Sequence, residues 1–138
     1  MAPKRRTTAL FLKSTVNGET NEYMYLADHR LKDGLHCLRY TDAQGDAETS
    51  NELMFRENSM FLRREGGFSG VMEFDPGKET EVRYKALMTE GVFCLETKEY
   101  SIEENEGTVK VRAAYLLKDE SGLAPIDCVQ EFTFKTPE

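Results

Sequence analysis

Two histidines are the side chains of this sequence whose spacing first suggests chemistry. His29 and His36 flank the dipeptide Asp33-Gly34, which predicts a tight hairpin turn. Such a hairpin brings the two imidazoles near each other, and Asp28 or Asp42 would add a carboxylate to an incomplete metal site. The spacing matches no known ligand pattern, so we predict no metal and no cofactor.

Arg63 and Arg64 form a second candidate because adjacent residues of a strand point to opposite faces. An inward arginine needs an anion, which is either a buried carboxylate or the carboxylate head of a fatty-acid-like ligand. A bulge or strand end that leaves both arginines in solvent is the favoured alternative. We name Arg63 as the candidate for an inward position, and the sequence leaves the choice between the two arginines open.

The three cysteines, Cys37, Cys94 and Cys128, lie far apart in predicted strands. An odd number without a CxxC pair favours buried, reduced thiols over metal ligands. His36 and Cys37 point to opposite faces of their strand, so they do not form a catalytic dyad. Because no serine nucleophile, phosphate-binding glycine loop or inward acidic pair is recognisable, we predict no catalytic residue, and an enzyme is the less favoured class.

The composition describes one acidic domain. The chain has 138 residues, 39% of them hydrophobic and 31% charged, with a formal net charge of −7, and this size is typical of a single domain. The net charge disfavours binding to nucleic acid or to an anionic membrane. We expect residues 1–6 to form a flexible basic tail, residues 7–136 to form the domain, and the protein to be cytoplasmic.

Nine turn signals divide the chain into about ten short segments. This regular division predicts an all-β protein built from hairpins. The signals are Asn17-Gly18, Asp33-Gly34, Gln44-Gly45-Asp46, Glu57-Asn58, Gly66-Gly67, Asp75-Pro76-Gly77, Glu90-Gly91, Asn105-Glu106-Gly107 and Ser121-Gly122.

Most segments alternate apolar and polar residues, as half-buried strands do. The clearest is 108–117, in which Val109 and Val111 alternate with Lys110 and Arg112. The segment 20–31 mixes its two faces, and the polar residues 41–51 predict a loop. Short connections favour a closed antiparallel up-and-down β-barrel of about eight to ten strands over a two-sheet sandwich.

The expected inward side chains are bulky, which favours a packed core over a ligand cavity. They are Phe55, Phe68, Met72, Phe74, Tyr84, Phe93, Leu95, Tyr115, Phe132 and Phe134.

A cavity is the alternative, and its candidate ligand-binding residues are Arg63, Met72, Tyr84, Thr97 and Tyr115. Hydroxyls among apolar walls are the mixture that small-molecule pockets use to orient a ligand. The first functional hypothesis is a barrel without enzymatic activity that binds a small hydrophobic or amphipathic molecule or serves as a stable interaction module. A protein-protein adaptor with a packed core and no ligand is the second hypothesis, and the sequence gives no oligomeric state.

Three stretches of the chain share strand spacing and turn glycines with a known family: Phe55-Arg56-Glu57-Asn58-Ser59-Met60 with Arg63-Arg64-Glu65-Gly66; Met72-Glu73-Phe74 with Gly77-Lys78-Glu79-Thr80; and Tyr84, Gly91, Phe93, Leu95 and Thr97 leading to Gly107-Thr108-Val109 and Ala114-Tyr115. On these stretches, about two thirds of the chain resembles the YwiB-like family of uncharacterised bacterial proteins. One departure is Leu87-Met88-Thr89-Glu90-Gly91, where members often carry Thr-Pro-aromatic-Gly just before the glycine.

This resemblance implies a calycin-like, or lipocalin-like, barrel in a bacterial cytosol. It transfers no catalytic residue, because the family has no settled activity. Calycin-like barrels often hold small hydrophobic ligands in the lumen, and that analogy concerns the fold alone.

Overall fold

A computed structural model describes residues 6–44, 47–86, 89–119 and 124–136 of the chain. Within these ranges the backbone forms strands and turns, and no helix is long and apolar enough to cross a membrane. The strands are β1 (Arg6–Val16), β2 (Glu19–Lys32), β3 (Leu35–Gln44), β4 (Ala47–Phe55), β5 (Met60–Gly66), β6 (Phe68–Phe74), β7 (Glu79–Ala86), β8 (Thr89–Asn105), β9 (Thr108–Asp119) and β10 (Ile126–Lys135).

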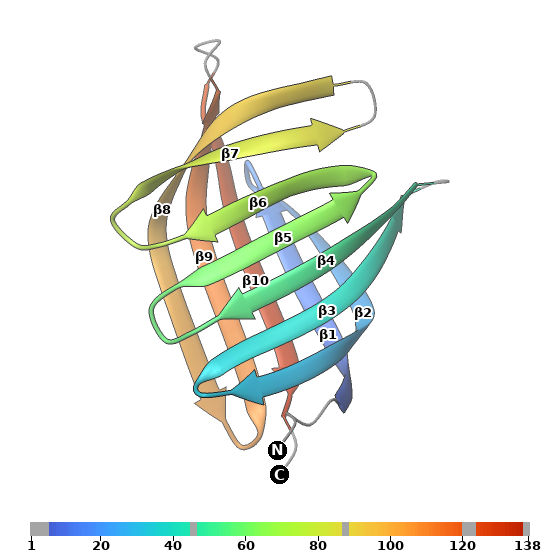
Figure 1. The fold of residues 1–138 in the computed structure, drawn as a ribbon. Coiled ribbons are helices and arrows are strands. Elements are labelled where there is room, and N and C mark those ends of the chain that lie inside the picture. Colours follow the sequence, from blue (N-terminus) through green and yellow to red (C-terminus); the bar gives the residue numbers. More distant parts are fainter. Residues whose placement is uncertain (1–5, 45–46, 87–88, 120–123, 137–138) are drawn as a thin grey trace.

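The ten strands form one closed antiparallel barrel in which each strand pairs with its neighbours in the sequence (Figure 1). The ring closes where β1 pairs with β10, from Phe11 opposite Thr133 to Val16 opposite Cys128. The predicted up-and-down barrel is therefore confirmed. Residues 1–5 of the expected tail lie outside the described residues, and Arg6 already belongs to β1.

Three two-residue turns have the backbone that their sequences predict. Asn17-Gly18, Asp33-Gly34 and Glu106-Gly107 all have positive φ angles, from 48° to 84°. Positive φ at both central residues defines a type I′ turn, whose twist matches that of the flanking strands. These turns fix the register of their hairpins. The predicted turns at 44–46 and 121–122 fall wholly or partly outside the described residues.

The expected loop is wrong for residues 41–44 and 47–51, because these residues belong to β3 and β4 and pair with each other. The pairing runs from His36 opposite Phe55 to Gln44 opposite Ala47. Asp42, Thr49 and Asn51 have limited exposure in this hairpin. Inward residues are polar here, so the alternation of apolar and polar residues that marks a strand is missing.

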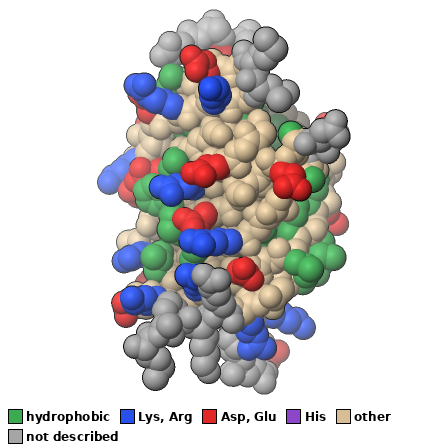
Figure 2. All heavy atoms as spheres, turned by 45° about the vertical axis from the view of Figure 1, so that its right-hand side comes forward, with side chains coloured by type: hydrophobic (Ala, Val, Ile, Leu, Met, Phe, Trp, Pro, Cys, Tyr) green, Lys and Arg blue, Asp and Glu red, His purple; other side chains and the backbone are tan. Residues whose placement is uncertain are grey.

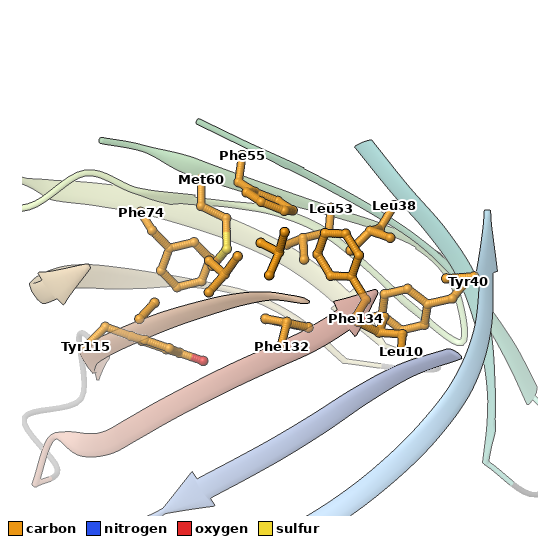
Figure 3. Packing of buried hydrophobic residues seen from close by; sticks show 14 of the residues in the cluster. Leu10, Leu38, Tyr40, Leu53, Phe55, Met60, Phe74, Tyr115, Phe132 and Phe134 are labelled. Atoms are coloured by element: carbon orange, nitrogen blue, oxygen red, sulfur yellow. The ribbon is translucent and has the colours of Figure 1, made fainter. Parts of the chain in front are cut away.

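The two ends of the barrel differ in packing. We call the end with the β2–β3, β4–β5, β6–β7 and β8–β9 connections the base, and the opposite end the mouth. Aromatic and aliphatic side chains from opposite walls meet in the base half (Figure 3). The largest side chains with less than 2% exposure are Phe55, Phe74, Phe132, Phe134, Leu10, Leu38, Leu53, Met60, Leu95, Val109 and Val111.

Candidate functional site

A cavity of about 400 Å³ occupies the mouth half of the barrel interior. Its floor is formed by core residues such as Met60, Phe74 and Phe132, and its upper wall reaches Val16 and Tyr23 near the β1–β2 turn. The other lining residues are Leu12, Ser14, Tyr25, Tyr40, Asp42, Leu62, Arg64, Phe68, Met72, Val82, Phe93, Tyr115, Leu117, Ile126, Cys128 and Gln130.

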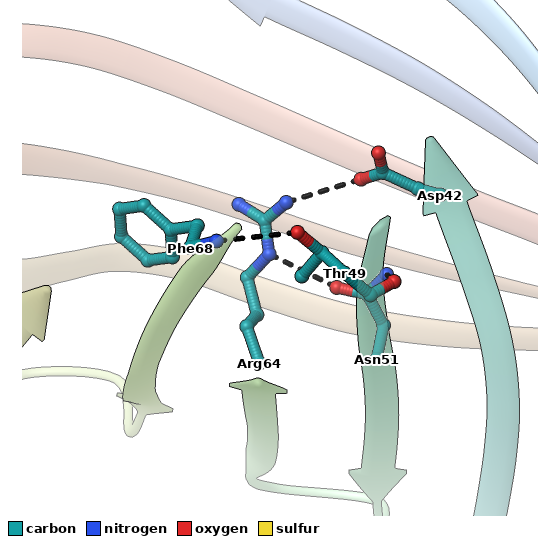
Figure 4. A network of polar contacts seen from close by, with 5 residues as sticks. All are labelled: Asp42, Thr49, Asn51, Arg64 and Phe68. Carbon is teal, nitrogen blue, oxygen red and sulfur yellow. Dashed lines mark hydrogen bonds and ion pairs between the residues drawn. The ribbon is translucent and has the colours of Figure 1, made fainter. Parts of the chain in front are cut away.

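Arg64 is the cationic side chain of this cavity. Its Nε donates to Asn51 Oδ1 at 2.9 Å, and its Nη2 donates to Asp42 Oδ2 at 3.1 Å (Figure 4). The side chains of Arg64 and Asp42 are 26% and 14% exposed, so the pair is shielded from bulk water. Shielding strengthens a charge-assisted contact relative to one on the surface.

The strand ends around Arg64 fix its orientation. The guanidinium carbon lies 4.8 Å from the centre of the Phe68 ring, a cation–π distance. The backbone amide of Phe68 donates to Thr49 Oγ1 at 3.2 Å, which ties the start of β6 to β4. Asn51 Nδ2 in turn donates to the Thr49 carbonyl at 3.2 Å. Within the described residues, Arg64 Nη1 has no protein acceptor, so one donor group remains available to a ligand.

Tyrosines supply the remaining polar groups near Arg64. The rings of Tyr25 and Tyr40 lie with centroids 4.8 Å apart, and Tyr23 stacks on Tyr25 at 6.2 Å. Burial raises the pKa of the Tyr25 and Tyr40 hydroxyls, and also that of Tyr115. These phenols therefore stay neutral and able to donate or accept hydrogen bonds at physiological pH.

The two histidines meet in the base half and are not among the residues that line the cavity. His29 Nε2 lies 3.0 Å from His36 Nδ1, and His36 Nε2 lies 3.4 Å from Glu104 Oε1. The His36 ring stacks on Phe55 at 4.7 Å. Burial, followed by the proximity of His36, lowers the pKa of His29 to about 4. Burial also lowers the pKa of His36, and Glu104 partly opposes that shift. This pair is a neutral, hydrogen-bonded part of the core.

The candidate residues named from the sequence occupy three different environments. Met72 and Tyr115 line the cavity. Tyr84 shares the inner face of β7 with Val82 but is not among the lining residues, and its ring stacks on Phe68 at 5.7 Å and on Phe93 at 4.8 Å. Thr97 is 2% exposed, and in the described part of the chain its Oγ1 has no hydrogen-bond partner.

Arg63 does not face the lumen, which corrects the choice made from the sequence. Arg63 is exposed and borders grooves on the outer surface, whereas Arg64 points inward. The expected arrangement with both arginines in solvent is also wrong. Leu62 and Arg64 are two residues apart in β5, so their side chains lie on the same face of the strand. Because Leu62 lines the cavity, Arg64 also points inward and Arg63 points outward.

Sequence reasoning missed the partners of Arg64. Asp42 and Asn51 lie in the hairpin that resembled a loop, and Tyr25 lies in the segment that mixes its two faces. Tyr40 ends a segment for which no inner face was predicted from the sequence. The signal that would have found them is their spacing. Asp42 lies two residues after the inward Tyr40, and Asn51 lies two residues before the inward Leu53.

Comparisons with known proteins agree with this barrel. The family model described as "Domain of unknown function (DUF1934)" matches residues 12–126. The crystal structure of the YwiB protein from Bacillus subtilis superimposes with a TM-score of 0.84 and 19% sequence identity, covering 99% of this chain and 96% of that chain. No curated protein matches the sequence. The matches confirm the resemblance and the fold expected from the sequence.

Proposed function

The chain belongs to the DUF1934 family, a domain of unknown function, and from the geometry of its lumen we propose that it binds a small amphipathic molecule. The observation that carries this proposal is the cavity of about 400 Å³ that contains Arg64. Small-molecule sites usually measure about 300–1,000 Å³ and combine mostly apolar walls with a few oriented polar groups.

The apolar part of the ligand would occupy the floor of the cavity. Met60, Leu62 and Met72 line that part, and methionine side chains adapt to ligands of different shape. A ligand there would cover apolar surface that otherwise contacts water, which is favourable by about 25 cal/mol for each Å² buried. Chain length should therefore matter for affinity.

The polar head of the ligand would lie beside Arg64. The free Nη1 group needs an acceptor, and a carbonyl or carboxylate oxygen of the ligand would provide one. Asp42 already balances the charge of Arg64, so the site suits a neutral acceptor as well as an anion. The hydroxyls of Tyr25 and Tyr40 would donate or accept further hydrogen bonds to the head group.

The cavity favours this function over a purely structural adaptor. An adaptor with a fully packed core has no reason to keep a hollow half or to place an arginine inside it, since an inward charge costs desolvation energy. The cysteines among the described residues are free thiols, which supports a cytoplasmic setting for the binding protein.

Calorimetric titration with decanoate and decanamide tests the proposal. Both probes have the same alkyl chain and an acceptor oxygen. We expect at least one to bind the native protein, and Arg64→Met to weaken that binding about tenfold or more, as expected for losing a hydrogen bond to a charged group. Arg63→Met is the matched control and should bind as the native protein does. If neither probe binds, or if both variants bind equally, the proposal is wrong.

A further inference from the structure

The wall of the barrel is incomplete between β2 and β3. The two strands pair only from Asp28 opposite Arg39 to Lys32 opposite Leu35, next to their hairpin turn. Residues 19–27 of β2 still pair with β1, and residues 40–44 of β3 still pair with β4. None of these described residues pairs across the junction, so β2 and β3 separate toward the mouth (Figure 1).

Strand geometry shows which backbone groups face this opening. In an antiparallel hairpin, alternate residues direct their N–H and C=O groups toward the same neighbour. The residues that flank a two-residue turn form a hydrogen-bonded pair, so Lys32 bonds to Leu35 and every second residue before it directs its backbone groups toward β3. Met24 and Leu26 belong to this set. On β3 the same alternation directs the backbone groups of Thr41 and Ala43 toward β2. Each edge therefore offers a row of unpaired donors and acceptors.

A groove of about 790 Å³ lies along the two unpaired edges. Met24 and Leu26 border it from β2, and Thr41 borders it from β3. The inner-face residues Tyr25 and Tyr40 line both this groove and the lumen cavity, so the pair of tyrosine rings separates the two. Figure 2 shows that hydrophobic side chains on this side of the barrel are surrounded by acidic and basic ones.

We propose that this groove binds an extended polypeptide segment of another protein, which pairs as an additional β-strand. Addition of a strand to an exposed edge uses backbone hydrogen bonds for affinity and alternate side chains for specificity. A strand in a sheet has a cross-section of about 4.8 by 10 Å, and each residue adds about 3.3 Å to its length. Five residues of strand therefore fill a volume of roughly 800 Å³. The groove has that size.

The side chains along the groove indicate which segment would fit. Toward the lumen the segment would contact Tyr25, Tyr40 and Asn51, which favours apolar or threonine side chains at alternate positions. On the outer side it would contact Met24 and Leu26, which are 60% and 72% exposed. An unpaired edge is a template for pairing with another chain, and apolar side chains exposed beside it add surface that such a partner would cover.

A single extended segment fits the opening better than a second folded copy does. A segment placed between β2 and β3 has unpaired backbone groups on both of its sides. The edge strand of a folded copy is already joined to its own sheet on one side, so it could pair with only one of the two edges.

Selection of octapeptides from a random display library is the experiment that tests this proposal. The native protein is the target, and Thr41→Pro is the counter-target. Proline removes an N–H that the register leaves unpaired, so this variant should fold while losing one hydrogen bond to the segment. Phe61→Ser, an exposed apolar residue on the outer face of β5, is the control for nonspecific apolar binding.

We expect the selected peptides to bind the native protein and Phe61→Ser equally, and Thr41→Pro at least tenfold more weakly. Amide hydrogen exchange of the native protein gives a second measurement that needs no variant. Bound peptide should slow exchange at Met24, Leu26, Thr41 and Ala43. Methylation of alternate peptide backbone nitrogens should abolish both effects.

Three results would overturn the inference. The first is that no peptide is enriched against the counter-target. The second is that enriched peptides leave the four amides unprotected. The third is a dimer in solution whose four amides are already protected without peptide, which would assign the groove to a second copy of the chain.

Discussion

The base and mouth halves of this barrel are built from the same strands, yet their interiors differ. In the base half, side chains such as Phe134 and Leu38 are at most 1% exposed and fill the space between the walls. In the mouth half, Arg64 and tyrosines surround a cavity of about 400 Å³. The base half therefore holds the fold together, and that stability lets the mouth half keep a polar, hollow interior.

Two adjacent leucines test where the packed core ends and the cavity begins. Leu53 and Leu62 lie opposite each other on β4 and β5. Leu53 is 0% exposed and belongs to the core, whereas Leu62 lines the cavity. We expect Leu53→Ala to lower the free energy of unfolding by about 3–4 kcal/mol, because it opens a new void in packed surroundings.

Leu62→Ala should cost only about 1–2 kcal/mol, because it enlarges space that already exists. Unfolding in urea, with both variants measured under the same conditions, gives the two values. Equal losses would mean that the surroundings of Leu62 are packed as tightly as those of Leu53.

The buried histidine pair predicts a pH dependence that belongs to the base half. The pKa of His29 is lowered to about 4, so below pH 6.5 the unfolded chain binds a proton that the folded chain does not. Stability should therefore fall as the pH drops from about 6.5 to 4, by about 3 kcal/mol for this group, since one pKa unit corresponds to about 1.36 kcal/mol.

Urea midpoints across this pH range measure the effect, and His29→Gln serves as the comparison because it cannot take up the proton. The native protein should lose more stability than the variant does on acidification. A native histidine that titrates near 6.5 in NMR spectra would contradict the prediction.

The two adjacent arginines provide the next comparison. Arg64→Met leaves Asp42 as a shielded carboxylate without its partner, and we expect a loss of about 1–3 kcal/mol. Arg63→Met replaces an exposed side chain and should change stability by less than about 0.5 kcal/mol. Thermal unfolding of both variants at neutral pH distinguishes them. A larger loss for Arg63→Met would mean that the inward position has been assigned to the wrong residue.

The smallest expected effect concerns Thr97. Among the described residues its Oγ1 is buried without a hydrogen-bond partner, so Thr97→Val removes an unsatisfied polar atom while keeping the branched shape. We expect stability to be unchanged or to rise by up to about 1 kcal/mol. Differential scanning calorimetry measures it. A clear loss of stability would show that the hydroxyl has a partner in solution, such as an ordered water molecule.

The barrel could be predicted from the sequence because the signals that indicate strands and turns lie within a few neighbouring residues. Turn dipeptides such as Asn17-Gly18 and the alternation around Val111 each indicate structure within a few residues. The site was harder to predict because it depends on which face of β5 points inward. That choice is decided by pairing with β4 and β6, and the two neighbouring arginines look identical without it.

The same difficulty explains the misassigned hairpin. Asp42 and Asn51 are polar because they hold Arg64, and an inward polar residue removes the pattern that identifies a strand. The hollow interior also has no local signal, since the cavity depends on how bulky residues from many strands divide between the two halves. The sequence alone favoured a packed core, and that expectation is correct for the base half only.

Methionine methyl groups offer the most direct test of ligand binding in the mouth half. Met60 and Met72 line the cavity, whereas Met24 and Met54 border grooves on the outer surface. In protein labelled with ¹³C at the methionine methyls, decanoate or decanamide should shift the signals of Met60 and Met72, show direct contacts between ligand and methyl protons, and leave Met24 and Met54 unchanged. Shifts confined to Met24 and Met54, or no shift with either probe at saturating concentration, would contradict a ligand-binding lumen.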